Sequence, residues 1–141
     1  MTMSFETPPS HAGASALRAH PAVLDRDALD RLRELDPQGT SRLLERVLRA
    51  FASSAERLAR QFGDARASGD MQGVRHVAHT LKSSSASIGA LALARLCAEI
   101  ETAIRAGALA ALPERLDAMD RELEAVLQAV QPMLSTSSTP R

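Results

Sequence analysis

Residues 75–90 read RHVAHTLKSSSASIGA, and this stretch holds two of the chain's four histidines and its only lysine. Its apolar and small residues recur every three or four positions, which is the spacing of one face of an α-helix. The positions of that face are Val74, Ala78, Leu81 and Ser85. Asp70 is suited to cap the start of the helix, and Gly89 supplies a natural stop. The sequence therefore predicts a helix from about residue 71 to residue 88.

Four more helices are predicted on either side of this one, because the apolar residues keep the same period. They run from about residue 25 to 35, 40 to 67, 91 to 106 and 113 to 131. Asp25 is the expected N-cap of the first, with Leu24 and Leu29 at the spacing of a hydrophobic staple. Pro37 and Pro132 are expected to end the first and last helices, since the residue before a proline avoids helical backbone angles.

The helices are joined by short links, and the chain shows no strand pattern, so the predicted fold class is all-α. We predict an antiparallel up-down-up-down four-helix bundle with a short additional N-terminal helix. The bundle domain is expected to cover residues 21–131. Residues 1–20 and 132–141 are rich in small and polar residues and proline and lack periodicity, so both are predicted to be disordered tails.

Composition excludes several classes of function. Basic and acidic residues both number 17, so the formal net charge is zero, whereas binders of nucleic acid or anionic membranes carry an excess of Lys and Arg. The chain has three Phe and neither Tyr nor Trp, so it lacks aromatic platforms on which bases stack. No apolar run is long enough to span a membrane. Neither a nucleic acid nor a membrane is therefore expected as a partner.

Cys97 is the only cysteine, which rules out an internal disulfide and a cysteine-based zinc site. The N-terminus lacks the basic start and the apolar stretch of a signal peptide, and together these features predict a cytoplasmic protein. His76 and His79 are spaced as a pair of metal ligands can be. No third or fourth ligand is evident, however, and we predict neither a metal nor a cofactor.

The face of the central helix that points away from the core carries the chemistry. Around His79 this face includes Arg75, His76, Lys82, Ser83 and Ala86. A neutral imidazole is a nucleophile toward phosphorus, and a cation one turn away stabilises the phosphoryl group that it would carry. Lys82 is placed for this role, while the small residues leave room for the reactive group of a second protein. Nothing nearby would activate water, so the pattern favours a phosphoryl carrier over a hydrolase.

The segment AHTLKSSSASIGA resembles the histidine phosphotransfer (HPt) domains of bacterial phosphorelays. Their core pattern is His, any residue, an aliphatic residue, Lys, usually Gly, then small residues and a Gly. The matching positions are His79, Leu81, Lys82, Ser85 and Gly89. The resemblance extends over roughly residues 21–130 and includes LDRDALDRLREL at the front and LARLCAEIETAIRAG after the central helix. Ser83 stands where the family most often has Gly, and serine is also small enough for a partner to approach.

The resemblance implies a role for each of these residues. It implies that His79 is the phospho-acceptor and that Lys82 supports the phosphoryl group. Members of the family commonly carry Gln or Glu at the position of Glu101, whose side chain accepts a hydrogen bond from the other imidazole nitrogen and fixes the tautomer. Gly89 would be a structural turn. The surface that docks a partner would include Arg75, His76, Ser83 and Ala86.

The leading interpretation is a monomeric phosphorelay intermediate without kinase activity of its own. It would accept a phosphoryl group on His79 from a receiver-domain aspartate and pass it to another response-regulator receiver, with a hybrid sensor histidine kinase among its partners. The receivers would supply the aspartate and Mg²⁺. The alternative is a helical adaptor that binds partners in a groove between helices and is not phosphorylated. The dimerisation domains of histidine kinases fit less well, because they typically have an acidic residue after the histidine, where this chain has Thr80.

Overall fold

The computed structural model describes residues 23–138, so the predicted N-terminal tail and residues 139–141 lie outside the described part of the chain. This part forms five helices and no strand, which confirms the all-α prediction. The helices are α2 (Arg26–Glu34), α3 (Leu43–Ser68), α4 (Met71–Ser87), α5 (Leu91–Ala106) and α6 (Leu112–Ser138). None of the described helices combines the length and the apolar character needed to cross a membrane.

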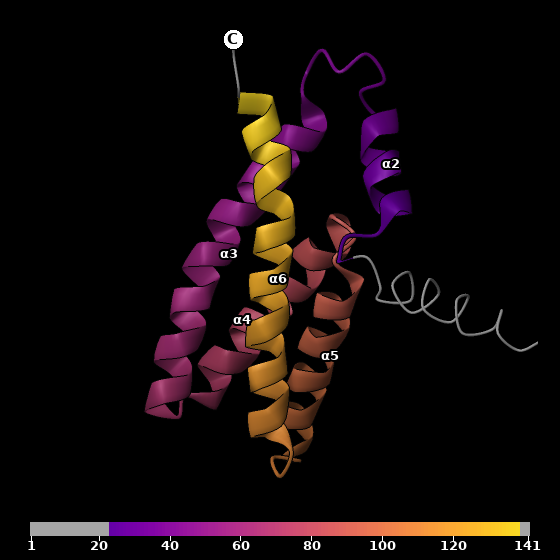
Figure 1. Ribbon diagram of the computed structural model, residues 1–141. Coiled ribbons are helices and arrows are strands. Elements are labelled where there is room, and N and C mark those ends of the chain that lie inside the picture. Colours follow the sequence, from indigo (N-terminus) through magenta and orange to yellow (C-terminus); the bar gives the residue numbers. More distant parts are fainter. Residues whose placement is uncertain (1–22, 139–141) are drawn as a thin grey trace, which may run out of the picture.

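Helices α3, α4, α5 and α6 form the bundle, and α2 packs beside it. Helix α4 contacts both α3 and α5, and α6 closes the bundle against α5 and α3. Consecutive helices run in opposite directions through short links, and α2 lies to one side near one end of the bundle (Figure 1). This is the predicted up-down-up-down arrangement with one additional helix before it.

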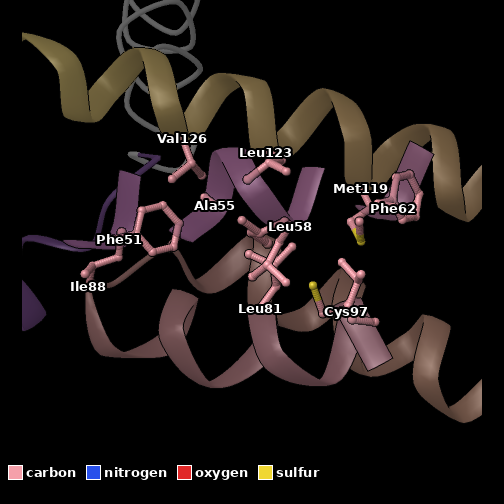
Figure 2. Packing of buried hydrophobic residues seen from close by; sticks show 14 of the residues in the cluster. Phe51, Ala55, Leu58, Phe62, Leu81, Ile88, Cys97, Met119, Leu123 and Val126 are labelled. Carbon is pink, nitrogen blue, oxygen red and sulfur yellow. The ribbon is translucent and has the colours of Figure 1, made fainter. Parts of the chain in front are cut away.

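The core is built from one apolar face of each bundle helix. On the apolar face of α3, Leu58 lies between Phe51 and Phe62 (Figure 2). Side chains of this size each gain about 1.5–3 kcal/mol when they leave water. Val74, Ala78, Leu81 and Ser85 are all buried, so the predicted inward face of α4 is confirmed. The opposite face of α4 is consequently the one that meets solvent.

Helix α3 begins at Leu43, later than predicted, because a side chain from the preceding loop caps it. Asp36 Oδ2 accepts a hydrogen bond from the Leu43 N–H at 3.0 Å, and Oδ1 accepts one from the Ser41 N–H at 3.3 Å. The hydrogen bond from Leu43 is also the main cause that lowers the pKa of Asp36. A cap seven positions before the first helical residue is not a local sequence signal, so the boundary could not be read from the pattern.

Pro132 does not end the last helix, which corrects the predicted boundary. Helix α6 continues through this proline to Ser138. A proline inside a helix removes one backbone hydrogen bond and costs about 3 kcal/mol. Leu134 is buried and extends the inward row of Val126 and Val130 by one more turn, while Met133 packs against the core beside it. This apolar burial offsets the cost of the proline.

Gly89 joins the end of α4 to the start of α2. Its φ of +81° lies in the left-handed region, and its carbonyl accepts a hydrogen bond from the Asp25 N–H at 2.7 Å. A Cβ at this position would lie 2.9 Å from the Asp25 backbone N and O atoms and from the Ala28 Cβ. Asp25 is also the N-cap of α2, since its carboxylate accepts from the Ala28 N–H at 3.1 Å. Gly89 is therefore both a turn and a point of close backbone contact.

We expect Gly89→Ala to destabilise the protein by about 2–4 kcal/mol, because the left-handed backbone penalty adds to the contact with α2. Gly107→Ala is the matched control. Gly107 has a similar φ of +72°, but nothing lies within 4 Å of its added Cβ. The control should therefore cost only the backbone penalty of about 1 kcal/mol. Urea unfolding monitored by circular dichroism measures both, and equal losses would show that the contact with α2 contributes nothing.

Candidate functional site

Glu101 of α5 lies against the exposed face of α4. Its Oε2 lies 2.8 Å from His79 Nδ1, and its Oε1 accepts a hydrogen bond from Lys82 Nζ at 2.7 Å. Arg105 Nη2 donates to Oε2 at 3.2 Å. The Glu101 side chain is only 2% exposed, whereas those of His79, Lys82 and Arg105 are 64%, 40% and 63% exposed. One buried carboxylate thus holds three exposed side chains, and we call these four residues the carboxylate clamp.

Helical spacing brings the clamp together. His79 and Lys82 are three residues apart on α4, and Glu101 and Arg105 are four apart on α5, so each pair shares one face of its helix. Helix α4 is fixed at its start by Asp70, whose carboxylate accepts a hydrogen bond from the Gly73 N–H at 3.0 Å. Because α4 and α5 pack directly against each other, the two pairs face each other across the contact between these helices.

The Glu101 carboxylate is ionised at neutral pH. The hydrogen bond from Lys82 is the largest cause that lowers the pKa of Glu101 below its ordinary value of 4.5, and the His79 hydrogen bond acts in the same direction. Burial opposes both by raising it. Nearby, burial and the charge of Glu101 raise the pKa of Cys97 to about 12, so this buried thiol is not a nucleophile.

The ionised carboxylate determines the tautomer of His79. A carboxylate without a proton can only accept hydrogen bonds, so Nδ1 must carry the hydrogen that points to Glu101. In the neutral ring, the second nitrogen, Nε2, then has a free lone pair. Since the side chain is mostly exposed, this lone pair is available to a reagent or a partner from solution. The site is therefore an oriented, solvent-facing nucleophile.

The predicted docking residues lie on the same helix but differ in their surroundings. His76, Ser83 and Ala86 are exposed, as the helical spacing predicted. Arg75 is half-buried, and its guanidinium donates to Gln72 Oε1 at 3.0 and 3.2 Å. His76 lines a shallow depression together with residues of α3, whereas His79 leans toward α5. Within residues 23–138, no group of three or more His, Cys, Asp or Glu side chains is arranged to hold a metal ion.

Arg105 is the member of the clamp that the sequence analysis missed. It follows Glu101 by four residues, and a basic residue at this spacing after an acidic one is a common helix-stabilising pair. That pattern gave no reason to connect Arg105 with the histidine of another helix. The contact follows from the packing of α4 against α5, which brings Glu101 Oε2 between His79 Nδ1 and the guanidinium.

Comparisons with known proteins agree on one class. A family model described as the Hpt domain matches residues 46–129. The chain is also similar to the crystal structure of histidine-containing phosphotransfer protein B (HptB) from Pseudomonas aeruginosa PAO1, with 30% sequence identity and a TM-score of 0.70. This likeness covers 81% of the present chain and 96% of the other. A search of curated proteins found no match.

A four-helix bundle with these similarities is a phosphotransfer carrier of a phosphorelay. The family model matches more than half of the chain, and the chain therefore belongs to the Hpt domain family. The resemblance seen in the sequence is thereby confirmed for the family and for the fold.

Proposed function

We propose that His79 is the phospho-acceptor of this carrier, taking a phosphoryl group from the aspartate of one receiver domain and passing it to the receiver of another response regulator. The observation that supports this most directly is the 2.8 Å contact of Nδ1 with an ionised, buried carboxylate, which leaves Nε2 as an exposed nucleophile. A hybrid sensor histidine kinase is the upstream partner that we propose.

The proposed transfer leaves the proton of the imidazole in place but changes the charge of the ring. The Nε2 lone pair forms a bond to phosphorus while the bond from phosphorus to the aspartyl oxygen breaks, and the aspartate leaves as a carboxylate. The proton on Nδ1 stays where it is, so the ring becomes positively charged as the new bond forms. Glu101 lies against Nδ1 and stabilises this charge, as a buried carboxylate does for histidine in other nucleophilic sites. The reverse reaction uses the same contacts.

Lys82 has the second role in the proposal. In the unphosphorylated site its ammonium is bound to Glu101 rather than free. Its four-carbon stem is flexible, so the charge can move to a phosphoryl group one helical turn away. We propose that the receivers contribute Mg²⁺ together with the aspartate and that the carrier needs no cofactor of its own, because its contribution is a rigid and correctly oriented imidazole.

We also propose that the protein acts as a monomer and has no kinase activity. The four bundle helices use their apolar faces in one core. Within the described chain, the large apolar side chains that remain exposed are single leucines on three separate segments: Leu35, Leu91 and Leu109. Leucines on three separate segments do not amount to the large apolar patch that a stable dimer requires.

The test is transfer from purified receiver domains encoded in the same genome, each charged with radiolabelled acetyl phosphate. We expect the protein to acquire label that is labile in acid and stable in base, the behaviour of a phosphoramidate bond. Absence of label with every receiver of the panel would support the adaptor alternative and overturn the phospho-acceptor proposal.

Docking over the exposed face of α4 predicts an effect of bulk close to the histidine. Ser83 is exposed one turn after His79, so Ser83→Tyr should slow transfer from a receiver at least tenfold, or about 1.4 kcal/mol of barrier. Ser83→Gly should transfer at least as fast as wild type, despite a helix-propensity cost of roughly 0.5 kcal/mol.

The matched control for this prediction is Ser53→Tyr, since Ser53 is an exposed serine on α3. Time courses of label moving from receiver to carrier give the rates, and melting curves of all three variants should resemble that of wild type. If Ser83→Tyr transferred at the wild-type rate, receivers would have to approach His79 over another surface.

A further inference from the structure

The Glu101 carboxylate is held by two cations, although one would neutralise it. Lys82 Nζ lies 2.7 Å from Oε1, and Arg105 Nη2 lies 3.2 Å from Oε2. Both cationic side chains are more than one-third exposed, and exposed ion pairs contribute little to folding stability. A second cation on the same carboxylate is therefore poorly explained as a device for stability alone.

Phosphorylation would change the surroundings of Lys82 but not those of Arg105 to the same extent. A phosphoryl group on His79 Nε2 carries between one and two negative charges and would lie within reach of the lysine, one helical turn along α4. If Lys82 moves to neutralise this group, it leaves Glu101 Oε1. Glu101 would then lose the hydrogen bond that most strongly lowers its pKa and would keep only its contacts with His79 and Arg105.

We propose that Arg105 is a positioning residue that holds Glu101 against His79 Nδ1 when Lys82 moves to the phosphoryl group. This inference rests on the proposed role of His79. Arg105 donates to Oε2, the same oxygen that faces Nδ1, so it fixes the atom whose position matters for the ring. Its guanidinium is always charged, and it belongs to the helix of Glu101, so it stays in place when Lys82 leaves.

Few titratable groups face the carboxylate, so the effects of Arg105 can be separated. His79 and Lys82 approach it from α4, and Arg105 approaches it from α5. Cys97, one turn before Glu101 on α5, remains a neutral thiol because burial raises its pKa. A change that follows removal of Arg105 can therefore be assigned to Glu101, Lys82 or the imidazole.

The test uses the full-length protein charged on His79 with phosphoramidate, which transfers its phosphoryl group to Nε2 and releases ammonia. The phosphoryl group is then titrated by ³¹P NMR, with His79→Gln as the blank. An adjacent lysine favours the dianion and lowers the second pKa of the phosphoryl group. In Arg105→Gln, Lys82 is retained by Glu101, so this pKa should rise by about half a unit, the size expected for one exposed ion pair.

Three companion variants define the effect. Lys82→Ala should raise the phosphoryl pKa at least as much as Arg105→Gln, because it removes the same cation directly. Arg105→Lys should restore the wild-type titration, since it returns a cation to Oε2. Arg95→Gln is the matched control, an exposed arginine of the same helix that lies outside the clamp, and it should titrate like wild type.

A second measurement separates this role from a structural one. In the unphosphorylated protein, the ¹⁵N signal of the protonated His79 Nδ1 should be unchanged in Arg105→Gln, because Lys82 still holds Glu101. Loss of that signal would show that Arg105 already supports the resting site and would overturn the proposed exchange. A wild-type titration in Arg105→Gln would overturn it as well. If wild type took no phosphoryl group on His79, the proposed function itself would fall, and this inference with it.

Discussion

In the His79→Gln variant we expect no phosphoryl uptake and an intact bundle. The imidazole is the one nucleophile of the clamp, and glutamine has no lone pair that can take up a phosphoryl group in its place. Its side chain is 64% exposed, so the substitution should change the free energy of unfolding by only about 0.5 kcal/mol or less. Transfer of label from a charged receiver and urea unfolding of the same preparation measure the two expectations together.

His76→Gln is the matched control for this variant, because His76 is also exposed on α4 but does not contact Glu101. It should accept label as wild type does. If His76→Gln lost the label and His79→Gln kept it, the assignment of the acceptor would be wrong.

Glu101→Gln should have the next largest effect and slow phosphoryl transfer about tenfold to a hundredfold, the size of effect known for groups that orient metal-binding histidines. Glutamine can still accept a hydrogen bond from Nδ1, but it cannot stabilise the positive charge that develops on the ring. Its amide also presents donors to Lys82 or Arg105, which have no acceptor to offer. Single-turnover rates with a charged receiver provide the measurement.

The same variant should reveal a pH dependence of stability. Because the pKa of Glu101 is lowered on folding, the carboxylate stabilises the folded state at pH values above its ordinary pKa of 4.5. This stabilisation should decline as the pH falls below 4.5 and disappear below the folded-state pKa. The difference in unfolding free energy between wild type and Glu101→Gln should therefore be largest near neutral pH and shrink in acid.

Glu99→Gln is the matched control for both measurements. Glu99 lies on α5 and pairs with Arg115 at 2.9 Å, outside the clamp. Its removal should leave the transfer rate unchanged. If the two variants transferred at the same rate, or if the stability difference of Glu101→Gln did not depend on pH, the role of the buried carboxylate would have to be abandoned.

The helices could be predicted from the sequence because their signals are local. The N-caps Asp25 and Asp70 and the inward faces come from residues within one or two turns of each other, and the structure has them as predicted. The end of α6 could not be predicted in this way. Pro132 is a strong local signal to stop, and only the packing of Leu134 on the core, a tertiary effect, overrides it.

In the candidate site, too, some features follow from local sequence signals and others only from tertiary packing. His79 and Lys82 could be selected from one helix by spacing, and Glu101 entered through family resemblance rather than through any pattern in the chain. The depth of Glu101, at 2% exposure, and its sharing by Arg105 depend on how closely α5 packs on α4. The distance between α4 and α5 cannot be derived from composition or from the spacing of apolar residues. The contact of Arg105 with Glu101 was therefore found only in the structure.

The hydrogen bond between Asp25 and Gly89 has a consequence for how the molecule opens. A helix as short as α2, with nine residues, is not stable in isolation, so α2 persists only while it is docked. Its undocking breaks few buried contacts compared with separation of the bundle helices, and it should occur as a partial, low-energy opening. Native-state hydrogen exchange would then detect two cooperative units, with the amides of α2 exchanging early and those of α4 remaining protected until the bundle unfolds as a whole.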